Sequence, residues 1–195
     1  MQSEREQVKR IGIFAGSFDP IHDGHIAVAE SAIKYLELDK LLFMVEKSPW
    51  TKKEPILFEH RKAMVELAIT EHPKISQLEV PDERFDLDKT LQKIEDLYPE
   101  SELYFIFGAD VFLRMNSGQW PNLDKLLKHY IVVFEREDYR DNAIASHAKE
   151  LGIVAAIIPS QHPYHSSSAV RLEPAKKQIW LSAKVAHYID KNNLY

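Results

Sequence analysis

The sequence predicts an α/β fold, a doubly wound parallel sheet of about six strands with helices on both of its faces. Two observations predict this class. Short apolar runs typical of buried strands alternate with stretches of helical period along the 195 residues, and 45% of those residues are hydrophobic, which is enough for a sizeable core. Such alternation favours right-handed crossovers between parallel strands, and ligands then bind at the carboxyl ends of the strands where the strand order reverses.

The first strand is expected over residues 8–15, an apolar run bounded by charge on one side and glycine on the other. The first helix is expected to begin near Asp23, after a bend shaped by Asp19 and Pro20, because apolar residues recur at helical spacing beyond it. Further strands are predicted at residues 40–45, 75–80, 103–107, 130–134 and 153–158, and further helices at residues 58–70, 87–97 and 182–192.

The composition fits one compact domain over residues 1–195, with residues 1–7 as a flexible N-terminal extension. A net charge of -5 gives no sign of a general nucleic-acid or membrane surface, so local sites must hold any anionic ligand. The chain has no cysteine, which excludes disulfides and iron–sulfur clusters. No apolar run approaches the roughly 18 to 20 residues of a membrane span, and we expect a cytoplasmic protein.

Residues 16–25, GSFDPIHDGH, join the first strand to the first helix. Unpaired N–H groups and the positive end of the helix dipole attract anions there, and Gly16 and Gly24 let a phosphate approach the backbone. His22 and His25 can donate hydrogen bonds that stabilise the charge developing on a displaced phosphoryl group. Taken alone, the two histidines are more simply exposed side chains beside a turn. A zinc site is a weaker alternative, since HxxH supplies only two ligands and the chain has no cysteine.

A second candidate anion site lies at residues 166–171, SSSAVR. Serines before a helical turn can cap its open N–H groups, and Arg171 lies one turn beyond Ser167 and Ser168. Hydroxyls, amides and a guanidinium can therefore converge on one anion. A serine run before a helix is more often only a cap, so the case for a ligand depends on the first motif.

The stretch GSFDPIHDGH resembles the GxFDPxHxGH signature of the HxGH nucleotidylyltransferase superfamily. The rest of the chain most resembles the bacterial nicotinate-nucleotide adenylyltransferase branch of that superfamily. The resemblance implies a Rossmann-like fold and an enzyme that joins ATP and nicotinate mononucleotide, giving deamido-NAD and pyrophosphate in NAD biosynthesis. It implies Mg²⁺ on the leaving phosphates of ATP, small molecules as partners, and no metal ligands from the chain. Whether the protein is a monomer or a homo-oligomer stays open.

The resemblance also implies which residues surround ATP. The run SSSAVR resembles the family's SSTxIR motif, with Ser168 in place of threonine and Val170 in place of isoleucine, whereas His165 stands where the family usually has an apolar residue. Residues 107–110, FGAD, match a GAD segment whose aspartate, here Asp110, binds the ATP ribose, although an N-capping role would explain it locally. The catalytic residues implied are His22, His25 and Arg171, and the ATP-binding residues are Gly16, Phe18, Gly24, Gly108, Asp110, Ser166, Ser167 and Ser168.

The residues implied for the acceptor substrate are spread over several loops. By resemblance, Ser17 lies near the acceptor phosphate, and Lys52 or Lys53 faces the substrate phosphates. Trp120 lies near the pyridine ring, and Arg136 stands at the place of a family arginine. The simpler interpretations are solvated surface charges for the lysines and the arginine, and core packing or an aromatic lid for the tryptophan.

The chain departs from the family just before the helix at Leu91. The nicotinate branch commonly has SYTxDTL there, whereas residues 84–91 are RFDLDKTL, so only Thr90 and Leu91 align. Asp86 and Asp88 would repel a nicotinate carboxylate if they faced it, or would accept hydrogen bonds from the amide of a nicotinamide. The choice of acceptor therefore stays open between nicotinate and nicotinamide mononucleotide, as do phosphopantetheine or cytidylyl specificity and a non-catalytic nucleotide-binding role.

The chemistry expected is direct in-line transfer. The mononucleotide phosphate, held near Gly16, Ser17 and Phe18, attacks the α-phosphorus of ATP, and pyrophosphate leaves against the two histidines, the serine run and Arg171. The nucleophile is already an anion, so no general base is needed. Positioning and charge stabilisation lower the barrier.

Overall fold

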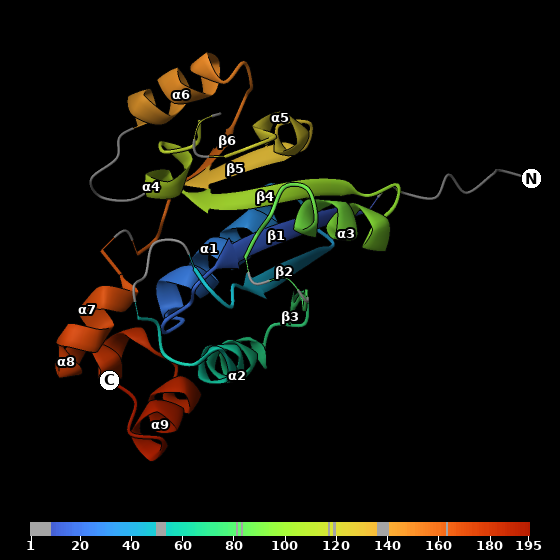
Figure 1. Ribbon diagram of the computed structural model, residues 1–195. Coiled ribbons are helices and arrows are strands. Elements are labelled where there is room, and N and C mark those ends of the chain that lie inside the picture. The colour runs from blue at the N-terminus through green and yellow to red at the C-terminus, as the bar shows by residue number, and fades with distance from the viewer. Residues whose placement is uncertain are drawn as a thin grey trace, which may run out of the picture.

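The computed structural model describes residues 9–49, 54–80, 82, 84–116, 118, 120–135, 141–162 and 164–195. Within these residues, six parallel strands form one sheet in the order β3-β2-β1-β4-β5-β6 (Figure 1), which confirms the predicted class. The strands are β1 (Arg10–Gly16), β2 (Lys40–Val45), β3 (Ile75–Gln77), β4 (Glu102–Gly108), β5 (Tyr130–Phe134) and β6 (Ala156–Ile158). The helices in this part are α1 (Asp23–Tyr35), α2 (Phe58–Ile69), α3 (Thr90–Leu97), α4 (Ala109–Phe112), α5 (Leu123–Leu126), α6 (Asp141–Glu150), α7 (Ser167–Leu172), α8 (Pro174–Trp180) and α9 (Ala183–Lys191).

The two faces of the sheet are buried under different helices. Ile13 and Phe14 are neighbours on β1 and enter opposite layers of the core, as the alternation of side chains along a strand requires. The Phe14 layer includes side chains from α1, α2 and α9, and the Ile13 layer includes side chains from α3, α4, α5 and α6. Burial on both faces explains why residues 41–45 form an uninterrupted apolar run.

The strand order reverses between β1 and β4. These two strands pair directly, and their carboxyl ends at Gly16 and Gly108 lead into α1 and α4, which cover opposite faces of the sheet. Chain segments that leave adjacent strands toward opposite faces open a crevice between them, which is the usual ligand position in doubly wound sheets.

Two predicted boundaries around the third strand are wrong. β3 ends at Gln77 rather than at residue 80, because Gln77 is its last residue paired with β2 and the chain then turns toward α3, where Asp82 contacts Lys93 at 2.8 Å. The helix α3 begins at Thr90 rather than at residue 87, since the Asp86 carboxylate accepts the N–H groups of residues 88 and 89 at 2.9 and 2.7 Å in a turn before it.

The last strand also differs from the prediction, beginning at Ala156 rather than at residue 153. The preceding residues close helix α6, with Gly152 at φ 72° and the Ile153 N–H bonded to the Ala148 carbonyl at 3.0 Å. Helices α4, α5, α6 and α8 are not predicted from the sequence. No helix in the described part of the chain has the length and apolar character to cross a membrane.

Candidate active site

An open cleft of about 1190 Å³ lies at the carboxyl ends of β1 and β4. Its walls come from the loop after β1, the start of α4, the segment before α3, and α7 with the serine that caps it. His22 and Gly24 line a small pocket beside it, and Lys52, Lys53 and Arg136 lie outside the described residues. The predicted residues that line the cleft are Gly16, Ser17, Phe18, His25, Gly108, Asp110, Trp120, Ser166, Ser167, Ser168 and Arg171.

The loop after β1 is folded tightly around Phe18. This residue has φ 45° and is 2% exposed, with its ring packed edge-on against Phe14 and Phe43 at centroid distances of 5.5 and 5.0 Å. A Cβ at Gly16 would lie 3.1 Å from the Phe18 ring, so glycine fits best there. Gly16 and Ser17 line the cleft beside this ring.

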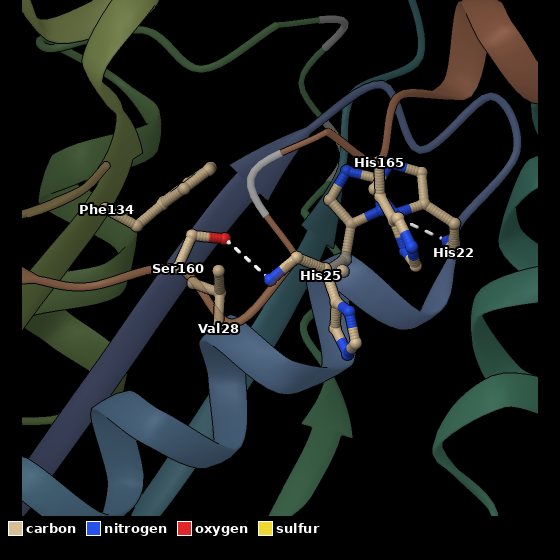
Figure 2. Close-up of a pocket in the computed structure, with 8 residues that line it drawn as sticks. His22, His25, Val28, Phe134, Ser160 and His165 are labelled. Atoms are coloured by element: carbon tan, nitrogen blue, oxygen red, sulfur yellow. Dashed lines mark hydrogen bonds between the residues drawn. The ribbon is translucent and has the colours of Figure 1, made fainter. Parts of the chain in front are cut away.

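His22 and His25 form a stacked pair at the start of α1 (Figure 2), with ring centroids 3.7 Å apart. The His22 backbone N–H donates to Nδ1 of His25 at 3.2 Å. Because Nδ1 accepts, the proton of the neutral His25 ring is on Nε2, and this donor is suited to a phosphate in the cleft. His22 is 4% exposed and lies between the His25 ring stacked on it and the neighbouring His165. The alternative that both histidines are exposed is therefore wrong.

The two predicted anion sites meet directly. Oγ of Ser167 donates to the Pro20 carbonyl at 2.8 Å, although the two residues are 147 positions apart. Arg171 donates from Nη1 to the Asp19 carbonyl at 2.5 Å and from Nη2 to Oγ of Ser168 at 3.2 Å. Ser166 is the N-cap of α7 and accepts the Ala169 N–H at 3.2 Å, so this serine does act as a cap.

The β4 end of the cleft is formed by the start of α4. The N-cap of α4 is Gly108, not Asp110, so the local N-capping interpretation of Asp110 is wrong. The Asp110 carboxylate folds back over Gly108, where an added Cβ would meet Oδ1 at 2.6 Å, and its Oδ2 lies 3.5 Å from the Arg114 guanidinium. Trp120 is half-buried and its ring meets Phe107 edge-on at 6.1 Å.

The acidic residues before α3 already have partners of their own. Asp86 bonds two backbone N–H groups of its turn, and Asp88 accepts from Asn122 Nδ2 at 2.8 Å and also contacts Lys125 Nζ. The Lys125 ammonium lowers the pKa of Asp88, although desolvation opposes it. A carboxylate paired in this way repels a nearby anion less than an isolated one does.

Arg61 is the most important residue that the sequence analysis did not single out. It is completely buried on α2, and its guanidinium donates to the carbonyl oxygens of Ser17 at 2.8 Å, Glu46 at 2.7 Å and Lys47 at 2.8 Å, while Nε reaches that of Ile56 at 3.0 Å. Burial lowers the pKa of Arg61, and the nearby Asp19 carboxylate opposes that shift. One cation therefore ties the loop after β1 to the loop after β2.

Glu46 is a second residue missed from the sequence. It follows β2 and lines the cleft, and its Oε1 accepts the Phe85 N–H at 3.2 Å. Burial raises the pKa of Glu46 against the effect of that hydrogen bond and of Arg61. For Arg61 a signal was present: it shares a helical face with the buried Met64 and Val65, and a cation on an apolar face requires polar partners. Nothing comparable in the sequence marked Glu46.

Comparisons with known proteins agree with this geometry. The family model described as cytidylyltransferase-like matches residues 13–173. A probable nicotinate-nucleotide adenylyltransferase of Clostridium perfringens is 33% identical over 201 residues, covering 96% of this chain and 98% of that protein. A protein of the same name from Thermus thermophilus is 33% identical over 192 residues, covering 95% and 99%.

Solved structures also match. Plasmodium falciparum nicotinic acid mononucleotide adenylyltransferase complexed with NaAD aligns with a TM-score of 0.78 at 23% identity, covering 96% of this chain and 97% of that one. Its complex with APC aligns with the same TM-score at 21% identity. At these identities the likeness concerns the fold, and it confirms the Rossmann-like architecture implied by the resemblance.

Proposed function

The chain belongs to the cytidylyltransferase-like family, and from this premise we propose that it joins ATP and nicotinate mononucleotide, giving deamido-NAD and pyrophosphate in NAD biosynthesis. The observation that carries the proposal is the contact between residues 16–25 and residues 166–171 at one cleft, made by Ser167 and Arg171. Two segments suited to phosphate, joined at the carboxyl ends of β1 and β4, match the needs of a triphosphate substrate.

In this mechanism the mononucleotide phosphate attacks the α-phosphorus of ATP in line with the leaving pyrophosphate. The Nε2–H of His25 and the guanidinium of Arg171 meet the charge that gathers on the leaving phosphates, and the N-terminal N–H groups of α7 add to it. Gly16 and Ser17 line the cleft, and in this scheme they lie beside the incoming phosphate. The incoming phosphate is already ionised, so no side chain has to act as a base.

Magnesium belongs with ATP in this scheme. Within the described residues no group of three or more histidine, aspartate or glutamate side chains is placed to hold a metal ion. A magnesium ion that arrives bound to the ATP phosphates suits such a site, since Mg²⁺ commonly keeps several waters and binds chiefly through substrate phosphates. It would supply further neutralisation of charge on the leaving phosphates.

The acceptor side of the cleft is compatible with nicotinate. Asp86 and Asp88 lie in the segment that departs from the family motif, residues 84–89, and isolated carboxylates there would repel the nicotinate carboxylate. Both carboxylates are held by neighbouring groups, Asp86 by its own turn and Asp88 by Lys125 and Asn122. The names of the relatives support nicotinate, and Trp120 lines the cleft, which supports the proposal that its ring contacts the pyridine.

Steady-state kinetics with nicotinate mononucleotide, nicotinamide mononucleotide and phosphopantetheine, at fixed ATP and magnesium, test the proposal. We expect pyrophosphate release with the largest kcat/KM for nicotinate mononucleotide. A preference for phosphopantetheine would overturn the substrate assignment while leaving the chemistry in place. Failure of every acceptor to release pyrophosphate would instead identify a nucleotide-binding protein without turnover.

We place the reaction in the cytoplasm, where its small-molecule substrates would be available.

A further inference from the structure

Residues 85–88, which we call the cleft wall, lie in the segment that departs from the family motif. All four of them line the cleft, and none of them belongs to a helix or a strand. The ring of Phe85 is anchored in the Ile13 layer of the core, 5.8 Å from the ring of Phe105. A wall without regular secondary structure depends on individual hydrogen bonds for the position of its backbone.

Glu46 contacts the cleft wall from a firmly held position directly after β2. Its backbone N–H donates to the Gly16 carbonyl at 3.0 Å, and its own carbonyl accepts from Nη1 of Arg61 at 2.7 Å. From this position its side-chain Oε1 accepts the N–H of Phe85 at 3.2 Å, although the two residues are 39 positions apart. A hydrogen bond to a carboxylate is of the stronger, charge-assisted kind. The Glu46 side chain therefore joins the cleft wall to the loop after β2.

Other contacts hold the cleft wall from two sides. On the side of α3, the Thr90 hydroxyl contacts the Arg84 carbonyl at 3.1 Å, and the Asp86 carboxylate bonds the N–H groups of its own turn. On the side of the loop after β2, Nε of Arg84 donates to the Ser48 carbonyl at 2.8 Å. The bond from Glu46 belongs to this second side, and it acts on Phe85, a residue that itself lines the cleft.

We propose that Glu46 is a positioning residue for the acceptor: its carboxylate holds the Phe85 N–H and keeps the cleft wall in place before the acceptor binds. The inference rests on the proposed function in one respect, that the cleft wall contacts the acceptor. A wall that is already ordered loses less conformational entropy when a ligand contacts it. Without the Glu46 carboxylate, the acceptor itself has to order the wall on this side, at the expense of affinity.

Hydrogen exchange of the Phe85 amide, followed by NMR in the protein without substrates, tests the contact. In Glu46→Ala this amide should exchange roughly tenfold faster, the size expected for a lost hydrogen bond to a charged group, while the amides of β4 keep their rates. Glu46→Gln should restore the protection, because glutamine keeps an oxygen that accepts the N–H. Equal exchange rates of the Phe85 amide in the wild type and in Glu46→Ala would overturn the inference.

Titration calorimetry with nicotinate mononucleotide tests the consequence for the acceptor. Glu46→Ala should bind it roughly tenfold more weakly, and Glu46→Gln should recover most of that loss. The affinity for ATP with magnesium should stay unchanged in both variants. Glu71→Ala is the matched control, since it removes the same group from an exposed ion pair with Lys184, 2.9 Å away, and should leave both affinities unchanged.

Equal losses of affinity for ATP and for the acceptor in Glu46→Ala would show a general disturbance of the fold and overturn the inference. No recovery in Glu46→Gln would also overturn it, because the charge rather than the hydrogen bond to Phe85 would then matter. The titration needs no turnover and can use whichever acceptor the kinetics select. A preference for another acceptor would therefore defeat the proposed substrate and leave this comparison intact.

Discussion

The proposed phosphate side and the proposed acceptor side of the cleft are built differently. The phosphate side consists of two short motifs, residues 16–25 and 166–171, which contact each other directly. The acceptor side takes single residues from separate loops, including Glu46, Asp88 and Trp120, and partners such as Lys125 and Asn122 hold one of them in place. A site made of contiguous motifs can be identified from sequence, whereas one assembled by tertiary contacts has to be seen folded.

Arg61 joins the two sides, and its replacement should have the largest effect. In Arg61→Met the apolar stem remains, but the carbonyls of Ser17, Glu46 and Lys47 lose a buried donor. We expect a loss of roughly 3–5 kcal/mol in the free energy of unfolding, measured by urea titration. Lys62 lies on the same helix as Arg61 and forms a more exposed ion pair with Glu79. Lys62→Met should therefore alter stability little. Equal urea midpoints for the Arg61 and Lys62 variants would show that Arg61 does not join the two sides.

His25→Ala should reduce kcat by roughly a hundredfold or more, the usual cost of losing one preorganised donor to developing charge. The loss should be the same with nicotinate and nicotinamide mononucleotides, because His25 lies at the motif suited to phosphate. His72→Ala is the control, since this histidine pairs with Glu30, 3.0 Å away, on the surface. Near-wild-type turnover in His25→Ala would remove the phosphate side from the mechanism.

Almost the whole sheet could be predicted from the sequence, because its strands are buried on both faces. The strands read as apolar runs, and β2 and β5 begin and end where predicted. The short helices α4 and α5 have four residues each, too few to show a period. The contacts of Arg61 with the Ser17 carbonyl and of Tyr195 with Asp19 join residues far apart in the chain, and a backbone carbonyl that accepts from Arg61 leaves no mark in the sequence.

Trp120→Ala should have a smaller effect than His25→Ala, and it should affect the acceptor side alone. Removing the indole takes away a ring that lines the cleft and packs on Phe107, and we expect KM for nicotinate mononucleotide to rise roughly tenfold, the scale of one base–aromatic contact. The affinity for ATP, titrated without acceptor, should be unchanged. A matching loss of ATP affinity would mean that the two sides are not energetically separate.

Glu46→Gln should give the smallest effect, through the pH dependence of stability. Burial raises the pKa of Glu46 above its ordinary 4.5. Between pH 4.5 and the raised pKa, the folded protein binds more protons than the unfolded chain, so its stability falls as the pH rises. Glutamine keeps an oxygen for the Phe85 N–H and carries no charge. In urea titrations the variant should therefore be more stable than the wild type above this range, and the difference should disappear below pH 4.5.

Glu71→Gln gives the opposite sign and serves as the control for that experiment. A hydrogen bond from Lys184 lowers the pKa of Glu71, so its ionised form stabilises the folded protein at neutral pH, and this contribution is lost as the pH falls through the lowered value. Removing that charge should make the protein slightly less stable at neutral pH. If Glu46→Gln instead lowered stability at neutral pH, as Glu71→Gln should, Arg61 and the Phe85 N–H would stabilise the Glu46 carboxylate more than burial destabilises it. The connection between the two sides of the cleft would then be held by charge.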